Sequence, residues 1–551
     1  MRPVDALLHI MRDEKVDTVF GNPGTSELPF TDALATASDI DFVLGVHEGP
    51  VVAMADGYAR ATGRPAFVSL HIAAGLANGL VGLLNASRSR TPLVVTAGQQ
   101  HRGHLVSDPL LSGDLVGIAR PAVKHAFDVQ HAHDLPVLLR RAFALARRPP
   151  AGPVFLSIPM DLLDEDTDIP VPTRSTVAPL GAATELDAAA ALLAGADRPA
   201  IVAGDGVGRD GAMAELVAVA EASGATVYHQ PMHDRVDFPM THPLYAGMLA
   251  PTNEAIRTAL AGHDLVFIVG THAFMAHHYT PGPAIPDGTT VIQLDTDPAE
   301  LGRNFPVALG LHGGLAVTLG ELGRRLAGRV PAAASRLAAG ARASAGRRAE
   351  IDAVARAGYG SAPLDPLAAV HAVTAGLPED AVVVEEAITS GVQLRRLLAL
   401  DRPGSLVHTV GGGLGWGLGA AIGHQLGQPD RPVVAVLGDG CTMFGLQGLW
   451  TAARHRVPAT FVVMNNGEYR TLKDTLDGRQ SRSTRSGHYV GLDLAAPGLD
   501  FTKAAEFFGV ESVRVRDTDQ LADAVAKAAV ATGPTLIDVP ITGHGGERRK
   551  P

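Results

Sequence analysis

The chain has 551 residues, of which 46% are hydrophobic, 5% aromatic and 19% charged, with 62 glycines and 38 prolines. This length suggests about three or four compact domains at roughly 150 residues each. The formal net charge is -11, and the only basic cluster is the terminal Arg548-Arg549-Lys550, which argues against a nucleic-acid-binding protein. The single cysteine, Cys441, excludes a disulfide framework and any cysteine-based zinc site.

From the sequence we expect neither a membrane span nor a signal peptide. It contains no run of about 18 or more apolar residues, so no membrane-spanning helix is predicted. Asp5, His9 and Arg12 stand where a signal peptide requires an uninterrupted apolar stretch. We therefore expect a large, soluble, cytoplasmic α/β protein, and an enzyme.

The first unit, residues 1–170, alternates strand-like and helix-like segments. Apolar β-branched runs at Phe67–Leu70 and Leu93–Thr96 lead into turns, and a helical pattern follows from Gly75 to Ala86. This alternation is typical of a parallel sheet covered by helices on both faces. Proline, threonine and serine then cluster without periodicity over residues 168–185, which indicates a linker.

The second unit, residues 185–330, repeats this alternation. Its predicted strands are Pro199–Ala203, Leu265–Val269 and Val291–Leu294. Residues 331–362 are rich in alanine, glycine and arginine with weak core patterning, so we expect a helical or mobile second linker there.

The third unit, residues 363–551, has predicted strands at Val382–Val384, Val433–Val436 and Phe461–Met464. The expected fold is therefore three successive α/β domains, each with a doubly wound parallel sheet.

The most informative motif is Gly438-Asp439-Gly440, followed after twenty-four residues by Asn465-Asn466. Both parts follow predicted strands, so both should lie at the carboxyl edge of one sheet, where ligands bind. Carboxylate and amide oxygens are ligands that Mg²⁺ or Ca²⁺ prefers. The glycines allow backbone N–H groups to approach a diphosphate without a side chain intervening.

A second Gly-Asp-Gly, at residues 204–206, serves as an internal control. Twenty-four residues after it stand Pro231-Met232, which offer nothing to a metal. We interpret this copy as a structural turn or a vestigial nucleotide loop.

With these motifs the chain resembles the thiamine-diphosphate-dependent 2-oxo acid decarboxylases, and among them the benzoylformate decarboxylases most. The resemblance covers essentially the whole chain, in the order pyrimidine-binding, central and diphosphate-binding domain. The matching stretches are Phe20-Gly21-Asn22-Pro23-Gly24, Ala55-Asp56-Gly57-Tyr58-Ala59, Thr96-Ala97-Gly98-Gln99-Gln100 and Leu449-Trp450-Thr451-Ala452-Ala453.

The resemblance implies a site for thiamine diphosphate and for Mg²⁺ or Ca²⁺. The implied metal ligands are Asp439, Asn466 and the backbone carbonyl of Glu468. The implied diphosphate contacts are the amides of Gly440 and Cys441 and the hydroxyl of Thr389. Cys441 as a nucleophile is the alternative, but the sequence shows no histidine paired with it.

The resemblance also assigns the residues around the organic rings of the cofactor. Glu48 aligns with the glutamate that binds N1′ of the aminopyrimidine, where a carboxylic acid in a dry pocket can share its proton with the ring nitrogen. The carbonyl of Gly413 would accept from the 4′-amino group, and Leu414 would wedge beneath the cofactor. Without the resemblance, Glu48 would be read as an acid at the start of a helix.

Two histidines and a threonine are candidates for the substrate. His71 follows the predicted strand 66–70, and His277 lies in a loop after the strand Leu265–Val269. Both align with active-site histidines of the resembled enzymes, and a histidine can protonate a carbanion near neutral pH. Thr25 stands where those enzymes use a serine to bind the substrate carboxylate. His101 and His104 have metal-ligand spacing, but no acidic or cysteine companion supports zinc.

The substrate itself is left open between aromatic and aliphatic 2-oxo acids. Leu110 offers an apolar wall, but Thr471, Leu472 and Thr475 stand where benzoylformate decarboxylases carry aromatic and apolar residues. Losing an aromatic wall removes ring contacts of about 0.5–1.5 kcal/mol, which weakens the case for a phenyl-bearing substrate.

We thus expect a homotetrameric, thiamine-diphosphate- and Mg²⁺-dependent decarboxylase of a small-molecule 2-oxo acid, with active sites at a dimer interface. One alternative is a carboligase or lyase of the acetolactate-synthase or 2-hydroxyacyl-CoA-lyase type. Another is a nucleotide-binding dehydrogenase that uses the loop 204–208, although this loop lacks the full Gly-x-Gly-x-x-Gly pattern. The third alternative is a non-catalytic member of the family, but the implied functional residues Glu48, Asp439 and Asn466 are all present, which argues against it.

Overall fold

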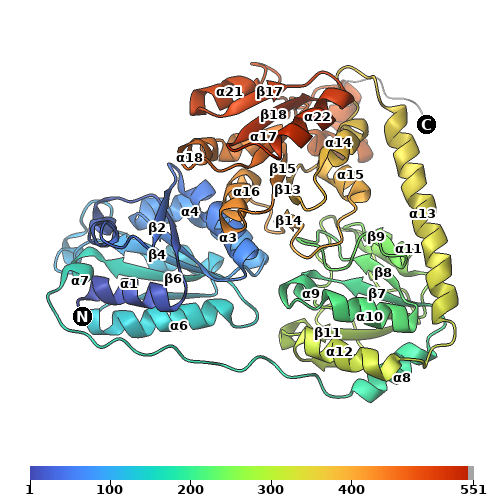
Figure 1. Cartoon of the computed structure of the whole chain (residues 1–551), viewed down its shortest axis with the longest axis horizontal. Helices are drawn as coiled ribbons and strands as arrows, with labels where there is room; N and C mark the ends of the chain where they lie inside the picture. The colour runs from blue at the N-terminus through green and yellow to red at the C-terminus, as the bar shows by residue number, and fades with distance from the viewer. Residues whose placement is uncertain (544–551) are drawn as a thin grey trace. The chain divides into compact units, whose positions relative to one another are not determined.

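The computed structural model describes residues 1–543 (Figure 1). The basic cluster Arg548-Arg549-Lys550 lies outside these residues. The chain forms two compact units. The first comprises Met1–Thr176, Gly358–Leu394 and the chain from Thr409 onward, and the second comprises Val177–Ala357 and Arg395–His408. Among residues 1–543, no helix is both long enough and apolar enough to cross a membrane.

Residues 1–543 contain three six-stranded sheets of parallel strands, which confirms the predicted fold class. The N-terminal sheet has the order β2-β1-β3-β4-β6-β5. Its strands are β1 (Thr18–Gly21), β2 (Asp41–Leu44), β3 (Ala66–Leu70), β4 (Leu93–Gln99), β5 (His125–Asp128) and β6 (Val154–Pro159). Its helices are α1 (Pro3–Asp13), α2 (Leu28–Leu34), α3 (Glu48–Thr62), α4 (Ile72–Arg88), α5 (Leu115–Ala119), α6 (Leu135–Arg147) and α7 (Met160–Asp164).

The central sheet has the order β12-β11-β10-β7-β8-β9. Its strands are β7 (Pro199–Ala203), β8 (Thr226–His229), β9 (Tyr245–Met248), β10 (Leu265–Val269), β11 (Thr290–Asp295) and β12 (Leu309–His312). Its helices are α8 (Leu186–Gly195), α9 (Asp205–Arg209), α10 (Met213–Ser223), α11 (Asn253–Leu260) and α12 (Leu315–Leu326). The segment expected as a second linker contains α13 (Ala333–Ala357), a 25-residue helix.

The C-terminal sheet has the order β14-β13-β15-β16-β18-β17. Its strands are β13 (Val382–Glu386), β14 (Leu406–His408), β15 (Val433–Gly438), β16 (Thr460–Asn465), β17 (Glu511–Arg514) and β18 (Thr535–Pro540). The helices of this part are α14 (Pro366–Gly376), α15 (Ser390–Leu397), α16 (Trp416–Gly427), α17 (Asp439–Gly445), α18 (Gly448–Arg454), α19 (Arg470–Gly478), α20 (Arg482–Ser486), α21 (Phe501–Phe508) and α22 (Thr518–Ala528).

The central strands of each sheet are buried along their length. Every residue of β3, β7, β10 and β13 is buried. Helices cover both faces of such sheets, so the strands read as continuous apolar runs instead of alternating patterns. This burial explains why these strands could be predicted from the sequence.

Helices α3 and α16 of the first unit pack at glycine positions. A Cβ added at Gly57 would lie 2.0 Å from the carbonyl oxygen of Ala420, and one at Gly423 would lie 1.7 Å from that of Met54. Both neighbours are backbone atoms, so no side-chain rearrangement could relieve these clashes. The two helices can approach this closely only because glycine stands at both positions.

A buried polar link joins the same two helices. The indole Nε1 of Trp416 donates to Oδ2 of Asp56 at 2.7 Å, and Nε of Arg60 donates to Oδ1 of that carboxylate at 2.8 Å. The Arg60 guanidinium also lies 5.1 Å from the centroid of the Trp416 ring. Since α3 begins at Glu48 and α16 follows the loop Gly411–Gly415, this packing fixes two predicted site elements relative to each other.

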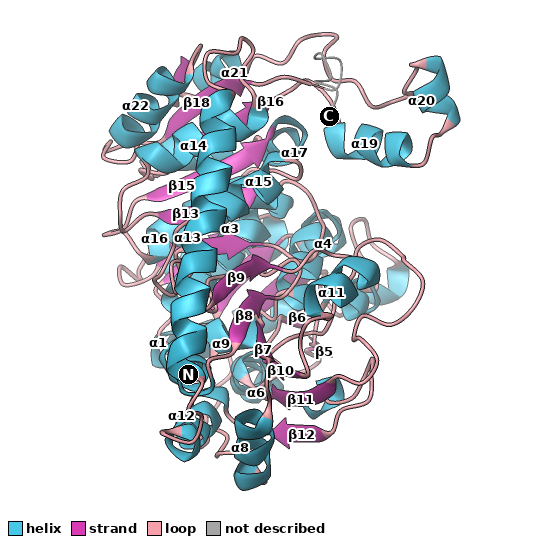
Figure 2. Ribbon diagram, turned by 90° about the vertical axis from the view of Figure 1, so that its right-hand side faces the viewer, coloured by secondary structure: helices cyan, strands magenta, loops and turns pink. Residues whose placement is uncertain are grey.

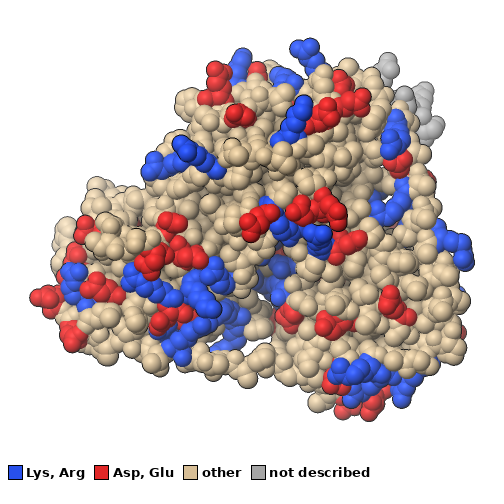
Figure 3. Space-filling model, in the orientation of Figure 1, with Lys and Arg blue, Asp and Glu red and all other residues tan. Residues whose placement is uncertain are grey.

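Charged side chains of both signs are mixed on the face shown in the space-filling view (Figure 3). On the face shown in Figure 3, Lys and Arg side chains lie among Asp and Glu side chains.

Candidate active site

The Gly-Asp-Gly motif and the asparagine pair meet at the carboxyl edge of the C-terminal sheet. Strands β15 and β16 are neighbours, with Gly438 opposite Met464. The Asp439 carboxylate therefore reaches the loop after β16, where its Oδ2 accepts from the amides of Asn466 at 3.1 Å and Gly467 at 2.7 Å. Its Oδ1 accepts from the amide of Gly440 at 2.7 Å.

Glu468, the third implied metal ligand, lies in the same loop. Its amide donates to Oδ1 of Asn466 at 3.0 Å, and Gly467 between them adopts a φ of +67°. A left-handed backbone of this kind suits glycine, because it has no Cβ. Asn466 and Glu468 thus share the turn after β16, and the Asp439 carboxylate reaches this turn from the end of β15.

The glycine-rich loop before α16 is held by a side chain from α4. The Nδ2 of Asn85 donates to the carbonyl oxygen of Gly413 at 2.8 Å, and the amide of Gly413 donates to Oδ1 of Asn85 at 2.9 Å. A carbonyl oxygen has two lone pairs, so the Gly413 carbonyl retains capacity for a second donor such as an amino group. Leu414, next in this loop, is half-buried.

Glu48 is the first residue of α3 and is buried. Each of its carboxylate oxygens accepts one amide N–H. Nδ2 of Asn22 donates to Oε1 at 2.9 Å, and Nδ2 of Asn78 donates to Oε2 at 3.0 Å. A Cβ at Gly75 would lie 3.1 Å from Oε1, so the glycine leaves room beside the carboxylate.

His71 is held by a buried carboxylate that the sequence analysis did not identify. Its Nδ1 lies 2.8 Å from Oε2 of Glu27 and 3.1 Å from Oγ of Ser26. Glu27 also accepts from the amides of Gly24 and Gly98, each at 2.9 Å. The His71 ring packs so closely on Gly24 that a Cβ there would lie 2.2 Å from Nδ1.

Thr25 and the predicted pocket residues are accessible in the single chain. Thr25 is exposed, whereas its neighbour Ser26 is buried and donates to Oε1 of Glu27 at 2.8 Å. Leu110 is 85% exposed in the loop after β4, and Leu472 is also exposed on α19. On α19, Oγ1 of Thr475 donates to the carbonyl of Thr471 at 2.8 Å.

Comparison with known proteins assigns the family. The descriptions that match are "Thiamine pyrophosphate enzyme, N-terminal TPP binding domain" over residues 1–132, "central domain" over 186–322 and "C-terminal TPP binding domain" over 389–539. The chain is 36% identical over 547 residues to the benzoylformate decarboxylase of Pseudomonas aeruginosa, covering 97% of this chain and 98% of that one. It belongs to the thiamine pyrophosphate enzyme family.

Solved structures and a second kind of relative are also similar. The 4-hydroxybenzoylformate decarboxylase of Rhodococcus jostii RHA1 superposes with a TM-score of 0.87 at 31% identity, covering 98% of this chain and 99% of that one. The benzoylformate decarboxylase of Polynucleobacter necessarius gives 0.88 at 29%, covering 98% of each. The acetolactate synthase large subunit of Haemophilus influenzae is 29% identical, over 95% of this chain and 91% of that one.

For a thiamine pyrophosphate enzyme, the environment of Asp439 fits a metal ion. Burial raises the pKa of this carboxyl, although backbone amides oppose the shift. Within residues 1–543, no cationic side chain pairs with it, so a bound cation would supply the missing positive charge. The same residues contain no cluster of three His, Cys, Asp or Glu side chains, so a cation held by Asp439 would take its other ligands from amide, carbonyl and diphosphate oxygens. This arrangement is usual for Mg²⁺.

The remaining diphosphate candidates are Thr389 and Cys441. Thr389 is half-buried in the turn between β13 and α15. Cys441 is buried on α17, where burial and then the charges of Glu386 and Glu385 raise the pKa of its thiol. Because the thiolate is the nucleophilic form, this environment disfavours Cys441 as a nucleophile.

His277 lies in the second compact unit, in the loop after β10. Its amide donates to the carbonyl of Pro251 at 2.9 Å, and its Nδ1 lies 3.0 Å from Nε2 of His278. His71 belongs to the first unit, so the meeting of the two histidines stays a prediction.

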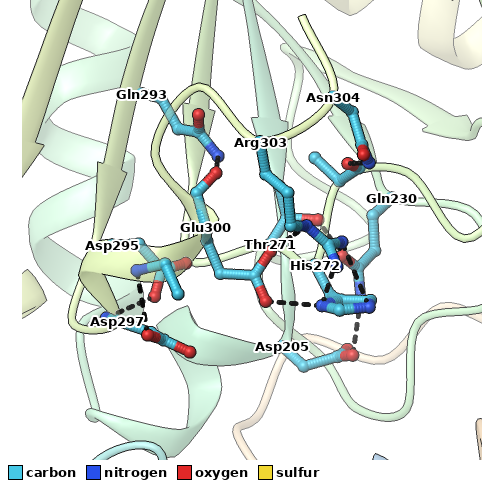
Figure 4. Close-up of polar contacts among 12 residues, drawn as sticks. Asp205, Gln230, Thr271, His272, Gln293, Asp295, Asp297, Glu300, Arg303 and Asn304 are labelled. Atoms are coloured by element: carbon cyan, nitrogen blue, oxygen red, sulfur yellow. Dashed lines mark hydrogen bonds and ion pairs between the residues drawn. The ribbon is translucent and has the colours of Figure 1, made fainter.

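The glycines of the loop 204–208 are used for packing in the central domain. A Cβ at Gly204 would lie 2.4 Å from Cβ of Thr271, and one at Gly206 would lie 2.8 Å from Cα of Gly270. Figure 4 shows side chains of the central domain that contact one another near these glycines, with Gln230 donating to Asp205 and Thr271 donating to Gln230. The loop therefore offers little support for the dehydrogenase alternative.

Sequence reasoning identified the acids and histidines but missed the residues that hold them, namely Glu27, Asn22, Asn78 and Asn85. One partial signal was available for Glu27, because a glutamate at the third position of a helix can accept from the backbone amide of the residue before the helix, as Glu27 does from Gly24. The three asparagines gave no comparable signal, because their partners lie 26, 30 and 328 positions away.

Proposed function

We propose that this enzyme catalyses the non-oxidative decarboxylation of a benzoylformate-like 2-oxo acid to an aldehyde and CO₂, with thiamine diphosphate and Mg²⁺. The observation that carries the proposal is His71, held through Nδ1 by Glu27 beside the Gly24–Thr25 turn. The similarity to enzymes named benzoylformate decarboxylase and 4-hydroxybenzoylformate decarboxylase supports it.

One group of residues holds the diphosphate end of the cofactor, and a second group holds its rings. At the diphosphate end, Asp439, Asn466 and the carbonyl of Glu468 bind Mg²⁺, while Thr389 and the amides of Gly440 and Cys441 bind the diphosphate. Glu48 binds the aminopyrimidine with an orientation set by Asn22 and Asn78, and Gly413 and Leu414 bind the rest of the ring system. When bound, thiamine diphosphate accepts the electron pair released as CO₂ leaves, which is the difficult part of the chemistry.

His71 moves a proton at the reacting carbon. Because its Nδ1 is engaged by Glu27, the atom that faces the substrate is Nε2. The Glu27 carboxylate stabilises the imidazolium and fixes the ring orientation, as an acid does for histidine in other acid–base sites. His277 assists from the central domain.

The substrate is held by Thr25 and apolar side chains. The exposed Thr25 hydroxyl donates to the substrate carboxylate, and Leu110, Leu472 and Thr475 line the pocket for the rest of the molecule.

The complete enzyme is a cytoplasmic homotetramer with active sites at a dimer interface. Apolar side chains are exposed on the helices that carry site residues, and exposed apolar surface is a feature of protein–protein contact sites. They are Val81 and Leu84 on α4 and Met443 and Phe444 on α17. A second copy of the chain would cover them.

Carboligation of the acetolactate-synthase or 2-hydroxyacyl-CoA-lyase type is the second candidate. Its support is the similarity to acetolactate synthase large subunits along nearly the whole chain. A histidine poised by a buried carboxylate favours proton transfer over capture by a second carbonyl compound, so decarboxylation to aldehyde remains the primary proposal.

The test is a panel of aromatic and aliphatic 2-oxo acids offered to enzyme reconstituted with thiamine diphosphate and Mg²⁺. Products are separated into aldehydes and acyloins by chromatography. We expect aldehydes as the main products, whereas acyloins as the main products would favour the carboligase.

A further inference from the structure

A buried lysine lies immediately after the proposed metal loop. Lys473 is the fourth residue of α19, and its side chain is 6% exposed. Its Nζ donates to Oε2 of Glu468 at 2.6 Å and also to Oδ1 of Asp493. It further lies 5.5 Å from the centroid of the Tyr489 ring, within reach of a cation–π interaction.

The two acids that Lys473 joins face each other across an antiparallel bridge. Glu468 pairs with Asp493, and backbone hydrogen bonds flank the bridge on both sides. The amide of Leu494 donates to the carbonyl oxygen of Gly467 at 2.7 Å, and the amide of Tyr469 donates to the carbonyl oxygen of Leu492 at 2.9 Å. Directly opposed like charges destabilise a strand pair, so the bridge depends on a cation between them.

The bridge closes the base of a long excursion of the chain. Residues 470–489 leave the C-terminal sheet after the metal loop, form α19 and α20, and return to the bridge. Figure 2 shows α19 and α20 projecting beyond the strands of this sheet. The predicted pocket residues Leu472 and Thr475 lie on α19, beside Lys473 in the sequence.

Two carboxylates compensate the charge of Lys473. The Glu468 side chain is buried with it, with Oε2 2.6 Å from Nζ, whereas the Asp493 side chain is 64% exposed. Arg470 contributes less to this cluster, since its Nη1 lies 3.9 Å from Oε1 of Glu468. Removing one partner of a buried ion pair is costly, because it leaves the other charge without its compensation.

We propose that Lys473 is a positioning residue that ties the metal loop Asn466–Glu468 to the helix bearing the pocket residues, so that metal binding orders residues 470–489. This inference rests on the proposed role of the loop in holding Mg²⁺. Outer residues that orient metal ligands are known to govern metal affinity without touching the ion.

The first test measures Mg²⁺ affinity in three variants. Cofactor is removed with EDTA, and Mg²⁺ is titrated at saturating thiamine diphosphate while tryptophan fluorescence is followed. Lys473→Met should raise the apparent Kd for Mg²⁺ by about 10- to 100-fold, the usual effect of losing an outer-shell partner. Lys473→Arg should recover most of the affinity. Lys503→Met, at a lysine 81% exposed on α21, is the matched control and should bind as wild type does.

The second test is limited trypsin digestion, in which the rate of cleavage is measured after the exposed Arg479, Arg482 and Arg485. In wild type and Lys503→Met, cofactor and Mg²⁺ together should slow cleavage at these sites, whereas in Lys473→Met they should not. If Lys473→Met fails to fold, Asp493→Asn replaces it, because Asp493 is 64% exposed and its loss leaves the Lys473–Glu468 pair intact. Asp493→Asn should then give a smaller shift in the same direction.

The outcomes separate this inference from the function on which it rests. Wild-type affinity and protection in Lys473→Met, or in Asp493→Asn where that variant is used, would overturn the role of Lys473 while leaving the proposed function standing. Absence of Mg²⁺-dependent binding in the wild type would overturn both.

Discussion

The Nδ1 atom of His71 lies 2.8 Å from Oε2 of Glu27, a carboxylate that is only 4% exposed. The second oxygen of that carboxylate accepts from the amide of Gly98 and from Oγ of Ser26, so its orientation is set from several sides. This relationship gives His71 a fixed ring orientation and leaves Nε2 for the substrate. It is the feature of the site that most directly indicates proton transfer.

Replacing Glu27 with Gln should therefore impair the proton-transfer step. We expect kcat to fall on the order of 10²-fold, the lower range for loss of effective acid–base catalysis, with little change in thiamine diphosphate affinity. Steady-state kinetics and cofactor titration measure the two quantities. Glu221→Gln is the matched control, since Glu221 also pairs with a histidine, His242 at 3.3 Å, but away from the site. Equal activity in the Glu27 variant and this control would contradict the assigned role.

Replacing Glu48 with Gln should stop activation of the cofactor. Without a carboxylic acid at the aminopyrimidine, exchange of the C2 hydrogen of bound thiamine diphosphate with deuterated solvent should slow by 10²-fold or more, on the order expected for an acid–base group. Quenched-flow NMR measures this exchange. Asn78→Ala removes one of the two amide donors to the carboxylate and should slow exchange less. Exchange at the wild-type rate in Glu48→Gln would exclude the residue from this step.

Glu386 should make stability depend on pH. It accepts from the amides of Trp416 at 3.2 Å and Gly417 at 2.7 Å, and burial raises its pKa to about 8 from an ordinary value of 4.5. Between these values the folded state keeps the proton and the unfolded state releases it, so this group makes the protein less stable as pH rises from 4.5 to about 8.

In Glu386→Gln the side chain cannot ionise, so the fall of the melting temperature across that pH window should be shallower than in the wild type. Differential scanning fluorimetry at closely spaced pH values measures both proteins. Parallel curves from pH 5 to 8 would mean that Glu386 does not carry this linkage.

The close contact of α3 and α16 predicts a severe effect at Gly423. A methyl group there would lie 1.7 Å from a backbone oxygen, so Gly423→Ala should destabilise the first unit by about 3 kcal/mol or more, the upper range for overpacking. Chemical denaturation measures the loss. Gly478→Ala, in α19 with nothing within 4 Å of the added Cβ, is the control and should be nearly neutral. A neutral Gly423→Ala would show that the helices are not packed through this position.

The fold could be predicted largely from the sequence because its strands are buried on both faces. Runs such as Val433–Val436 and Leu265–Val269 are continuously apolar, and the structure places them in β15 and β10. The segment that forms α19 and α20 gave no such signal, since most of its residues are polar and few are buried.

Some contacts of the candidate site could be predicted from the sequence, and others could not. Asp439 and Asn466 could be paired from the sequence, because neighbouring parallel strands bring their carboxyl ends together. Asn85 could not be assigned to Gly413, because their contact depends on how α4 packs against the loop before α16, 328 positions away in the sequence. Lys473 was missed for a different reason, because the chain returns to its partner Asp493 only after it has left the sheet and formed α19 and α20.

The most direct test of the central claim is the stoichiometry of products from a carboxyl-labelled 2-oxo acid such as [1-¹³C]benzoylformate. Enzyme stripped of cofactor is assayed alone and after addition of thiamine diphosphate and Mg²⁺, and labelled CO₂ and aldehyde are measured together. We predict no turnover without the cofactor, and with it one CO₂ released for each aldehyde formed. Failure to release CO₂ from any 2-oxo acid, or release of CO₂ without an equal amount of aldehyde, would contradict the account.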